Sequence, residues 1–147
     1  MSCWTNAHGT IAGKFETVVS EEVALDYLEK VVGKQLRWEE ERSDDDMLDE
    51  WNYAFDHPEL YLPLGSEGSL HSNYSYDSST GEYEIKIGGN LRDVYDTDWL
   101  LKWFVDIWKK LNPTLIRVKV ATDDGFDIQK WKRVSPCDRT RIVEVKK

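Results

Sequence analysis

Apolar and polar residues follow two different periods along the chain, and together these periods predict an α+β protein. A period of two, with apolar side chains at alternate positions, indicates half-buried strands, whereas a period of 3.6 indicates amphipathic helices. The first pattern predicts strands over residues 8–18, 70–76, 83–91, 115–122, 126–133 and 139–145. The second pattern predicts helices between Ser20 and Gly33, over 45–55 and over 98–111.

Cap residues indicate where these helices begin. Ser20 is a typical helix N-cap, and Gly33 is a typical helix stop. Residues 44–46, all aspartates, are expected to cap the second helix, and Asp96 or Thr97 the third.

Glycines mark special backbone positions in the predicted strands. The sequence Asp123-Asp124-Gly125 predicts a hairpin turn between the strands that flank it. Gly9 and Gly13 weaken the first strand and predict either a bulge or a close approach of another group to the backbone.

The order of the predicted elements is β, α, α, β, β, α, β, β, β. Without the second helix, the core βαββαβ pattern predicts a ferredoxin-like sandwich, in which helices cover one face of a single sheet. The helix over 45–55 is then an extra acidic helix, and the last strands form a C-terminal extension. No repeat or linker interrupts the chain, so residues 1–147 are expected to form a single domain.

The net charge of −9 comes from one segment. Residues 39–59 contain ten acidic residues and a single basic one, Arg42, whereas acids and bases are equal in number in the rest of the chain. The protein is therefore expected to be an electric dipole whose field steers association with a basic partner. Basic residues from Arg117 onward alternate with acids and form no sustained stripe, so direct binding of nucleic acid is not expected.

Several other classes of protein are not expected. No apolar run approaches the roughly 18 to 20 residues of a membrane span, and the N-terminus shows no secretory signal, which predicts a cytoplasmic protein. Cys3 and Cys137 are expected to be free thiols. The three histidines, His8, His57 and His71, lack metal-ligand spacing, and no metal or cofactor is expected.

One catalytic pattern is present in a loose form. The tripeptides His8-Gly9-Thr10 and His71-Ser72-Asn73 resemble the paired H-x-[ST] motifs of two-histidine phosphoesterases, whose imidazoles act as general acid and base on a phosphodiester. Asn73 replaces the hydroxyl residue of the second motif. The alternative is a structural role for both histidines, and the protein is expected not to be an enzyme.

The acidic segment has two interpretations. An exposed run of acids is usually a solvated face, but closely spaced carboxylates also imitate the phosphates that basic nucleic-acid-binding surfaces engage. The apolar residues Met47, Leu48, Trp51, Ala54 and Phe55 predict a packed stripe, so the carboxylates are expected to be displayed on an ordered helix. The candidate partner-binding acids are Glu39, Glu40, Glu41, Asp44, Asp45, Asp46, Asp49 and Glu50.

Two tryptophans supply a second candidate surface. Trp99 and Trp103 lie four residues apart on the flank of the third predicted helix. They are expected either to complete the edge of the core or to form an interface with a partner or with a second copy of the chain.

Three stretches resemble a family of small, functionally uncharacterised proteins encoded by bacteriophages and related mobile elements. They are the W-T-x-x-x-G pattern that begins at Trp4, the Gly-Ser-Glu-Gly-Ser-Leu segment over 65–70, and residues 90–93 followed by Trp103-Phe104. The resemblance implies a phage or prophage origin and assigns no activity to particular residues.

A phage origin favours a protein that binds and blocks a factor of the bacterial host. We expect an anti-defence inhibitor, for instance an anti-CRISPR protein, that presents its acidic surface to a basic, nucleic-acid-binding host protein. The main alternative is a sponge for nucleotide signals, with Trp4, Tyr74, Tyr76 and Arg92 as its candidate ligand-binding residues. The two-histidine phosphoesterase is the third hypothesis.

Overall fold

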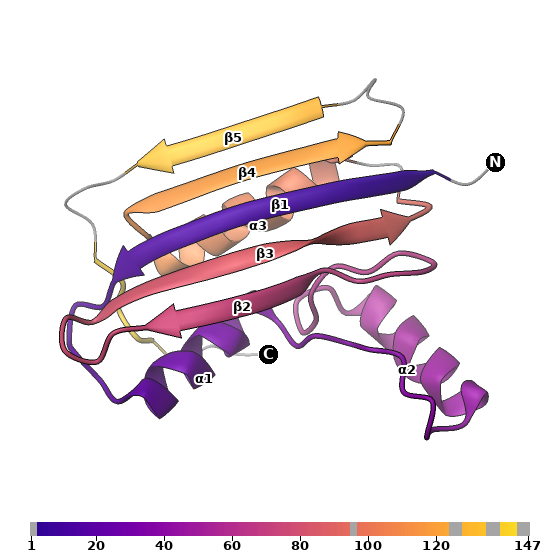
Figure 1. Ribbon diagram of the computed structural model, residues 1–147, viewed down its shortest axis with the longest axis horizontal. Helices are drawn as coiled ribbons and strands as arrows, with labels where there is room; N and C mark the ends of the chain where they lie inside the picture. Colours follow the sequence, from indigo (N-terminus) through magenta and orange to yellow (C-terminus); the bar gives the residue numbers. More distant parts are fainter. Residues whose placement is uncertain (1–2, 95–96, 124–127, 135–138, 144–147) are drawn as a thin grey trace.

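The computed structural model describes residues 3–94, 97–123, 128–134 and 139–143. Within these residues the protein is α+β, with one five-stranded antiparallel sheet and three helices (Figure 1). In chain order the elements are β1 (Trp4–Lys14), α1 (Glu21–Val32), α2 (Asp44–Asp56), β2 (His71–Tyr76), β3 (Glu82–Arg92), α3 (Thr97–Leu111), β4 (Leu115–Thr122) and β5 (Ile128–Val134).

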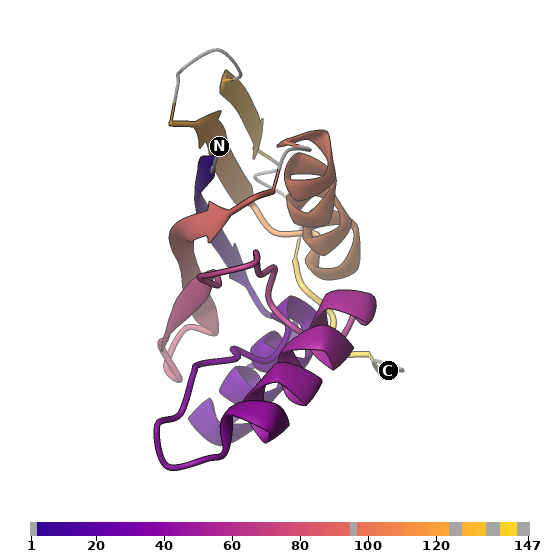
Figure 2. The same cartoon turned by 90° about the vertical axis from the view of Figure 1, so that its right-hand side faces the viewer.

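The sheet has the strand order β2-β3-β1-β4-β5, and every neighbouring pair is antiparallel. Helices α1 and α3 lie on one face of the sheet, and the other face is open (Figure 2). No helix among the described residues is long and apolar enough to cross a membrane.

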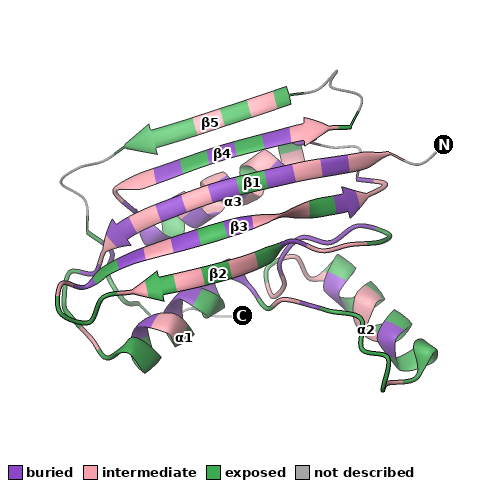
Figure 3. Ribbon diagram, viewed as in Figure 1, coloured by how far each residue is buried: buried purple, intermediate pink, exposed green. Residues whose placement is uncertain are grey.

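The alternating pattern of the strands explains this two-layer arrangement. Along β1, β3 and β4, buried residues alternate with exposed or half-buried ones, as the banded strands of Figure 3 show. The buried set contacts α1 and α3 and forms the main core, whose centre includes Ile11, Ile85, Leu100, Phe104 and Ile116. Burial of this set is the main driving force for folding.

Gly9 and Gly13 are places of close approach, as the sequence predicts, and the pairing of β1 with β3 runs through both without a bulge. A methyl group on Gly9 would collide with the buried ring of Phe104, and one on Gly13 would lie 2.7 Å from the Cζ of Tyr83. Two aromatic rings therefore rest directly on the backbone of β1.

The helices begin and end close to their predicted positions. Ser20 accepts a hydrogen bond from the N–H of Val23, and Gly33 ends α1 with a φ of 117°. The cap of α2 is Ser43, which accepts from the N–H of Asp46, so the prediction that aspartates 44–46 form the cap was wrong. These aspartates occupy the first turn, where the helix dipole favours negative charge.

The ends of the chain differ from the prediction. The first strand begins at Trp4, because Trp4 to Asn6 pair with the far end of β3. It stops at Lys14, which pairs with Glu82, the first residue of β3. The predicted strand over 139–145 is reduced, in its described part, to one bridge between Thr140 and Phe15. Its apolar residues Ile142 and Val143 are exposed. Asp96, Asp124, Gly125 and Cys137 lie outside the described residues.

Candidate functional site

Helix α2, which carries most of the predicted binding residues, stands apart from the sandwich. It lies beyond the β2 edge of the sheet (Figure 1), and its Cα atoms come within 8 Å of no other helix or strand in the described chain. Only Met47 and Ala54 of this helix are buried. A small second cluster of Leu36, Ala54 and Leu64 attaches it to the connections on either side.

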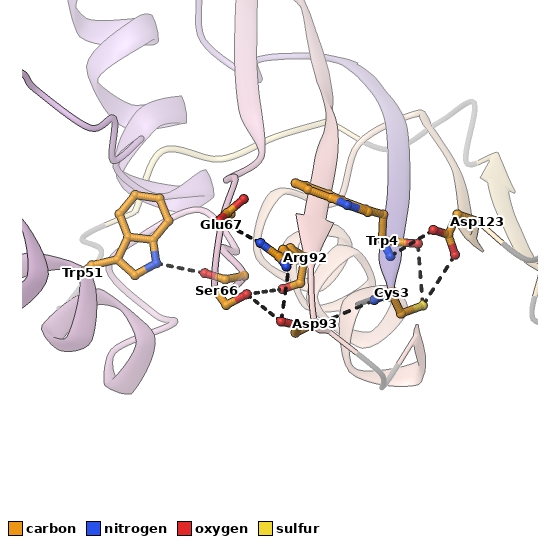
Figure 4. Close-up of polar contacts among 9 residues, drawn as sticks. Cys3, Trp4, Trp51, Ser66, Glu67, Arg92, Asp93 and Asp123 are labelled. Carbon is orange, nitrogen blue, oxygen red and sulfur yellow. Dashed lines mark hydrogen bonds and ion pairs between the residues drawn. The ribbon is translucent and has the colours of Figure 1, made fainter. Parts of the chain in front are cut away.

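A hydrogen bond from Trp51 reinforces this attachment on the side that follows the helix. The indole N–H of Trp51 donates to the carbonyl oxygen of Gly65 at 2.8 Å (Figure 4). Trp51 is therefore the polar link between α2 and the Gly-Ser-Glu-Gly loop at residues 65–68.

That loop is fastened to the end of β3. The backbone N–H of Ser66 donates to the carbonyl of Arg92, and the N–H of Arg92 donates to the carbonyl of Glu67. Side chains repeat the link, since Arg92 pairs with Glu67 at 2.8 Å and Ser66 donates to Asp93 at 2.9 Å (Figure 4). These bonds fix the Gly-Ser-Glu-Gly loop to the end of β3, so residues 65–68 have a structural role in this chain.

The outward face of α2 is acidic. At 100° per residue, Asp45, Asp49 and Asp56 lie opposite the buried pair Met47 and Ala54, and all three are exposed. The remaining predicted acids of this segment, apart from Glu50, are also exposed: Glu39, Glu40, Glu41, Asp44 and Asp46. The structure thus displays seven of the eight predicted acids to solvent.

Glu50 is the exception because its carboxylate already has partners. Arg42 donates to it in a close ion pair, and the Nζ of Lys34 lies 3.7 Å away. The hydrogen bond from Arg42 is the largest cause that lowers the pKa of Glu50 and raises the pKa of Arg42. Glu50 therefore ties the segment before α2 to the helix.

We expect Glu50→Gln to lower the Tm by about 2 °C at neutral pH, because a neutral amide holds the two cations less well. The lowered folded-state pKa means that the stabilisation is complete above the unfolded-state pKa of about 4.3. It is lost as the pH falls through the folded-state value. Thermal unfolding measured from neutral to acidic pH checks this. At neutral pH the variant should have a lower Tm than the unmodified protein, and in acid the two Tm values should be equal. Asp49→Asn is the matched control, and an equal Tm loss in both variants would contradict the role given to Glu50.

The predicted apolar stripe of α2 is only partly buried. Met47 and Ala54 lie in it as expected and Trp51 is half-buried, but Leu48 is 50% exposed and Phe55 is 53% exposed. The prediction was wrong for these two because α2 packs on loops, which cover a narrower strip than a sheet or helix would. Leu48 and Phe55, seven residues apart, therefore form an exposed apolar edge beside the acidic face.

Trp99 and Trp103 are half-buried on α3 and pack against the main core. The two indoles line a groove of about 210 Å³ together with Pro58 and Glu59 from the connection that follows α2. Pro58 and Trp99 also line a second hollow of about 30 Å³, together with Phe55 from the exposed edge of α2. The two surfaces predicted from the sequence are therefore neighbours.

The residues proposed for a nucleotide sponge are not brought together. Trp4 and Arg92 pair with each other at one end of the sheet, on its open side. Tyr74 and Tyr76 lie on the helix-covered side, where burial raises the pKa of Tyr74 and the hydroxyl of Tyr76 donates to the carbonyl of Val19. These four side chains do not form one site.

The two histidine motifs share the open face. His8 of β1 and His71 of β2 both pair with Gly88 of β3, one from each side. Their backbones are thus two strand spacings apart, about 10 Å.

Sequence reasoning missed a basic surface on this open face. Arg117 and Lys119 of β4 lie directly opposite Lys132 and Lys130 of β5, and Lys86 of β3 belongs to the same row as Arg117. We call these five residues the cationic face. The signal in the sequence was that basic residues recur at every second position in both strands, and alternate side chains of a strand lie on the same face of the sheet.

No protein-family model, curated protein or solved structure matches the chain. Among the described residues, no group of three His, Cys, Asp or Glu side chains is placed to hold a metal ion.

Proposed function

We propose that this protein is a non-enzymatic binding protein that presents the acidic face of α2 to a basic surface of another protein. The observation that carries the proposal is the position of α2, an ordered helix outside the sandwich whose acids and apolar edge both face solvent.

The anatomy of this surface supports a protein partner. Protein interfaces combine an apolar centre with a polar or charged rim, and Leu48 and Phe55 lie beside exposed carboxylates in this way. The groove of Trp99 and Trp103 extends the apolar part, and Trp is enriched among binding hot spots. The surplus of negative charge favours a basic partner and raises its rate of association.

The charge density of α2 supports mimicry of a nucleic acid. Apart from Glu50, five aspartates lie along a helix about 20 Å long, which is roughly one charge per 4 Å. One strand of duplex DNA carries one charge per roughly 3.4 Å of axis. The preferred partner is therefore a nucleic-acid-binding protein that this chain inhibits, and the resemblance to phage proteins favours a defence protein of an infected bacterium.

The proposal is tested with a triple variant, Asp45→Asn, Asp49→Asn and Asp56→Asn, in which the outward face of α2 is neutral. Proteins retained from a bacterial lysate by the immobilised chain are identified by mass spectrometry, purified, and titrated calorimetrically. We expect the variant to bind the partner at least about tenfold more weakly, with a smaller dependence on salt. Duplex DNA is expected to compete with the unmodified protein.

The matched control neutralises three exposed acids of α1, with Glu21→Gln, Glu22→Gln and Glu29→Gln. It changes the net charge equally and is expected to bind like the unmodified protein. A partner that binds both triple variants with unchanged affinity would refute the proposal, provided that both variants keep the thermal stability of the parent.

We further infer that the sandwich is ferredoxin-like. Without β5 and α2, the strand order β2-β3-β1-β4 and the element order βαββαβ support this assignment. The acidic helix is then an insertion between α1 and β2, and β5 is an added edge strand.

A further inference from the structure

The open face of the sheet contains a hollow of about 650 Å³ that the acidic surface does not explain. Side chains of four strands surround it, from β3, β1, β4 and β5, and the cationic face supplies all five of its Lys and Arg residues. This volume is within the range of small-molecule sites, roughly 300–1,000 Å³.

Four of these cations face one another in pairs, at a cost in electrostatic repulsion. Arg117 faces Lys132 and Lys119 faces Lys130 across the β4–β5 pair, and directly opposed side chains of like charge destabilise an antiparallel sheet. Lys86 has an ion pair with Glu84 at 3.6 Å, but the other four form no ion pair within the described residues. A bound anion would remove the repulsion.

The spacing suits an anion with several charged oxygens. Opposed residues have Cβ atoms about 5 Å apart, and alternate residues of one strand are about 6.7 Å apart. Arg117, Lys119, Lys130 and Lys132 thus form a four-point lattice. Thr10 and His8 of β1 line the same hollow and add hydrogen-bonding groups beside the charges.

The scarcity of stacking surfaces distinguishes between anionic ligands. Single-stranded nucleic acids are held by aromatic side chains on which their bases stack. Among the described residues, Trp131 is the one Phe, Tyr or Trp residue that lines the hollow; it pairs with Val118 on the helix-covered side, and its ring centroid lies 6.1 Å from that of Trp108. On the open side the described lining thus offers five cations and a single small ring, the imidazole of His8, which is too little to stack successive bases.

The cationic face is also separated from the acids of α2. Helix α2 lies beyond β2 at one edge of the sheet, while β4 and β5 lie at the other (Figure 1). Three strand spacings, about 14 Å, separate β2 from β4, which exceeds the screening length of about 8 Å at physiological salt. The negative net charge therefore does not cancel the local positive potential.

We propose that the cationic face binds a small molecule carrying a chain of phosphates, with the phosphate oxygens over Arg117, Lys119, Lys130 and Lys132. This site is independent of the acidic helix.

The test titrates the full-length protein calorimetrically with inorganic tripolyphosphate, with ATP and with a short oligo(dT). The variant Lys119→Gln with Lys130→Gln removes one opposed pair of the lattice. Its control, Lys109→Gln with Lys110→Gln, replaces two exposed lysines of α3 and changes the net charge by the same amount. We expect tripolyphosphate and ATP to bind the parent and the control equally, and the face variant at least about tenfold more weakly.

Three results of the titrations would overturn the proposal, and so would one result of light scattering. The first is that neither phosphate compound binds the parent, and the second is that the face variant and the control lose affinity equally. The third is that oligo(dT) binds while tripolyphosphate and ATP do not, which would assign the face to nucleic acid. A competing explanation is that the cationic face binds the acidic helix of a second copy of the chain. Light scattering on the same variants tests it: self-association of the parent and the control that is lost only in the face variant would support this explanation.

Discussion

Replacing Gly68 with alanine is expected to destabilise the protein by about 3 kcal/mol. Gly68 has a φ of 77°, a left-handed conformation that costs an alanine about 1 kcal/mol or more. A methyl group there would also collide with the carbonyl oxygen of Asn90 in β3. Asn90 pairs with Asn6 of β1 on one side and faces the 65–68 loop on the other, so its carbonyl has little room to move.

Two other glycines serve as controls in urea unfolding. Gly81 has a similar φ of 81°, but its nearest neighbour would be a methyl of Val18 at 3.3 Å, so Gly81→Ala is expected to cost about 1 kcal/mol. Gly88→Ala would meet the exposed imidazole of His8 at 3.0 Å and the carbonyl oxygen of Ala7 at an ordinary contact distance of 3.7 Å, and is expected to cost still less. A loss for Gly68→Ala no greater than for Gly81→Ala would mean that the 65–68 loop is not seated on β3.

Gly9→Ala is expected to cost about 2–3 kcal/mol for a different reason. The backbone of Gly9 lies in a regular strand, so an added methyl causes no conformational strain. It would instead press into the ring of Phe104, which is fully buried and packed on all sides. The cost is that of overpacking a core.

A double variant separates this mechanism from a general weakening of β1. Phe104→Leu removes ring atoms at the point of collision and is expected to cost about 1–2 kcal/mol alone. In the combined variant the alanine methyl occupies part of the vacated space, so the loss should be smaller than the sum by about 1 kcal/mol. Strict additivity in a urea double-mutant cycle would show that Gly9 and Phe104 do not share this space.

Local signals in the sequence predicted most of the secondary structure, because those signals act over a few residues. Ser20 and Gly33 bound α1 as expected, and the alternation in β4 gave its bounds without error. The ends of β1 were missed because Trp4 pairs with Arg92, and because β1 ends at Lys14 and Val18 belongs to no strand among the described residues. Both facts depend on strand partners far away in the chain.

The sequence showed which acids belong to the candidate site, but not that Glu50 is held in ion pairs while the others face solvent. Arg42, Lys34 and Glu50 come together only because the segment before α2 folds back on the helix. Leu48 and Phe55 have the spacing of core residues, and only the lack of a neighbouring helix or strand leaves them exposed. The cationic face was missed because lysines that alternate with other residues look dispersed until β4 and β5 are paired.

The division of the apolar interior into two clusters has a consequence for motion. The main core holds the sheet together with α1 and α3. Helix α2 is held by the buried Met47, by the small cluster of Leu36, Ala54 and Leu64, by the hydrogen bond from Trp51 and by the ion pairs of Glu50. A unit held by so few contacts opens at a much lower free energy than the whole protein unfolds. Helix α2 should therefore detach from the rest of the protein and dock again as a cooperative unit while the sheet stays intact. A partner that binds the docked form of α2 would make this local opening rarer.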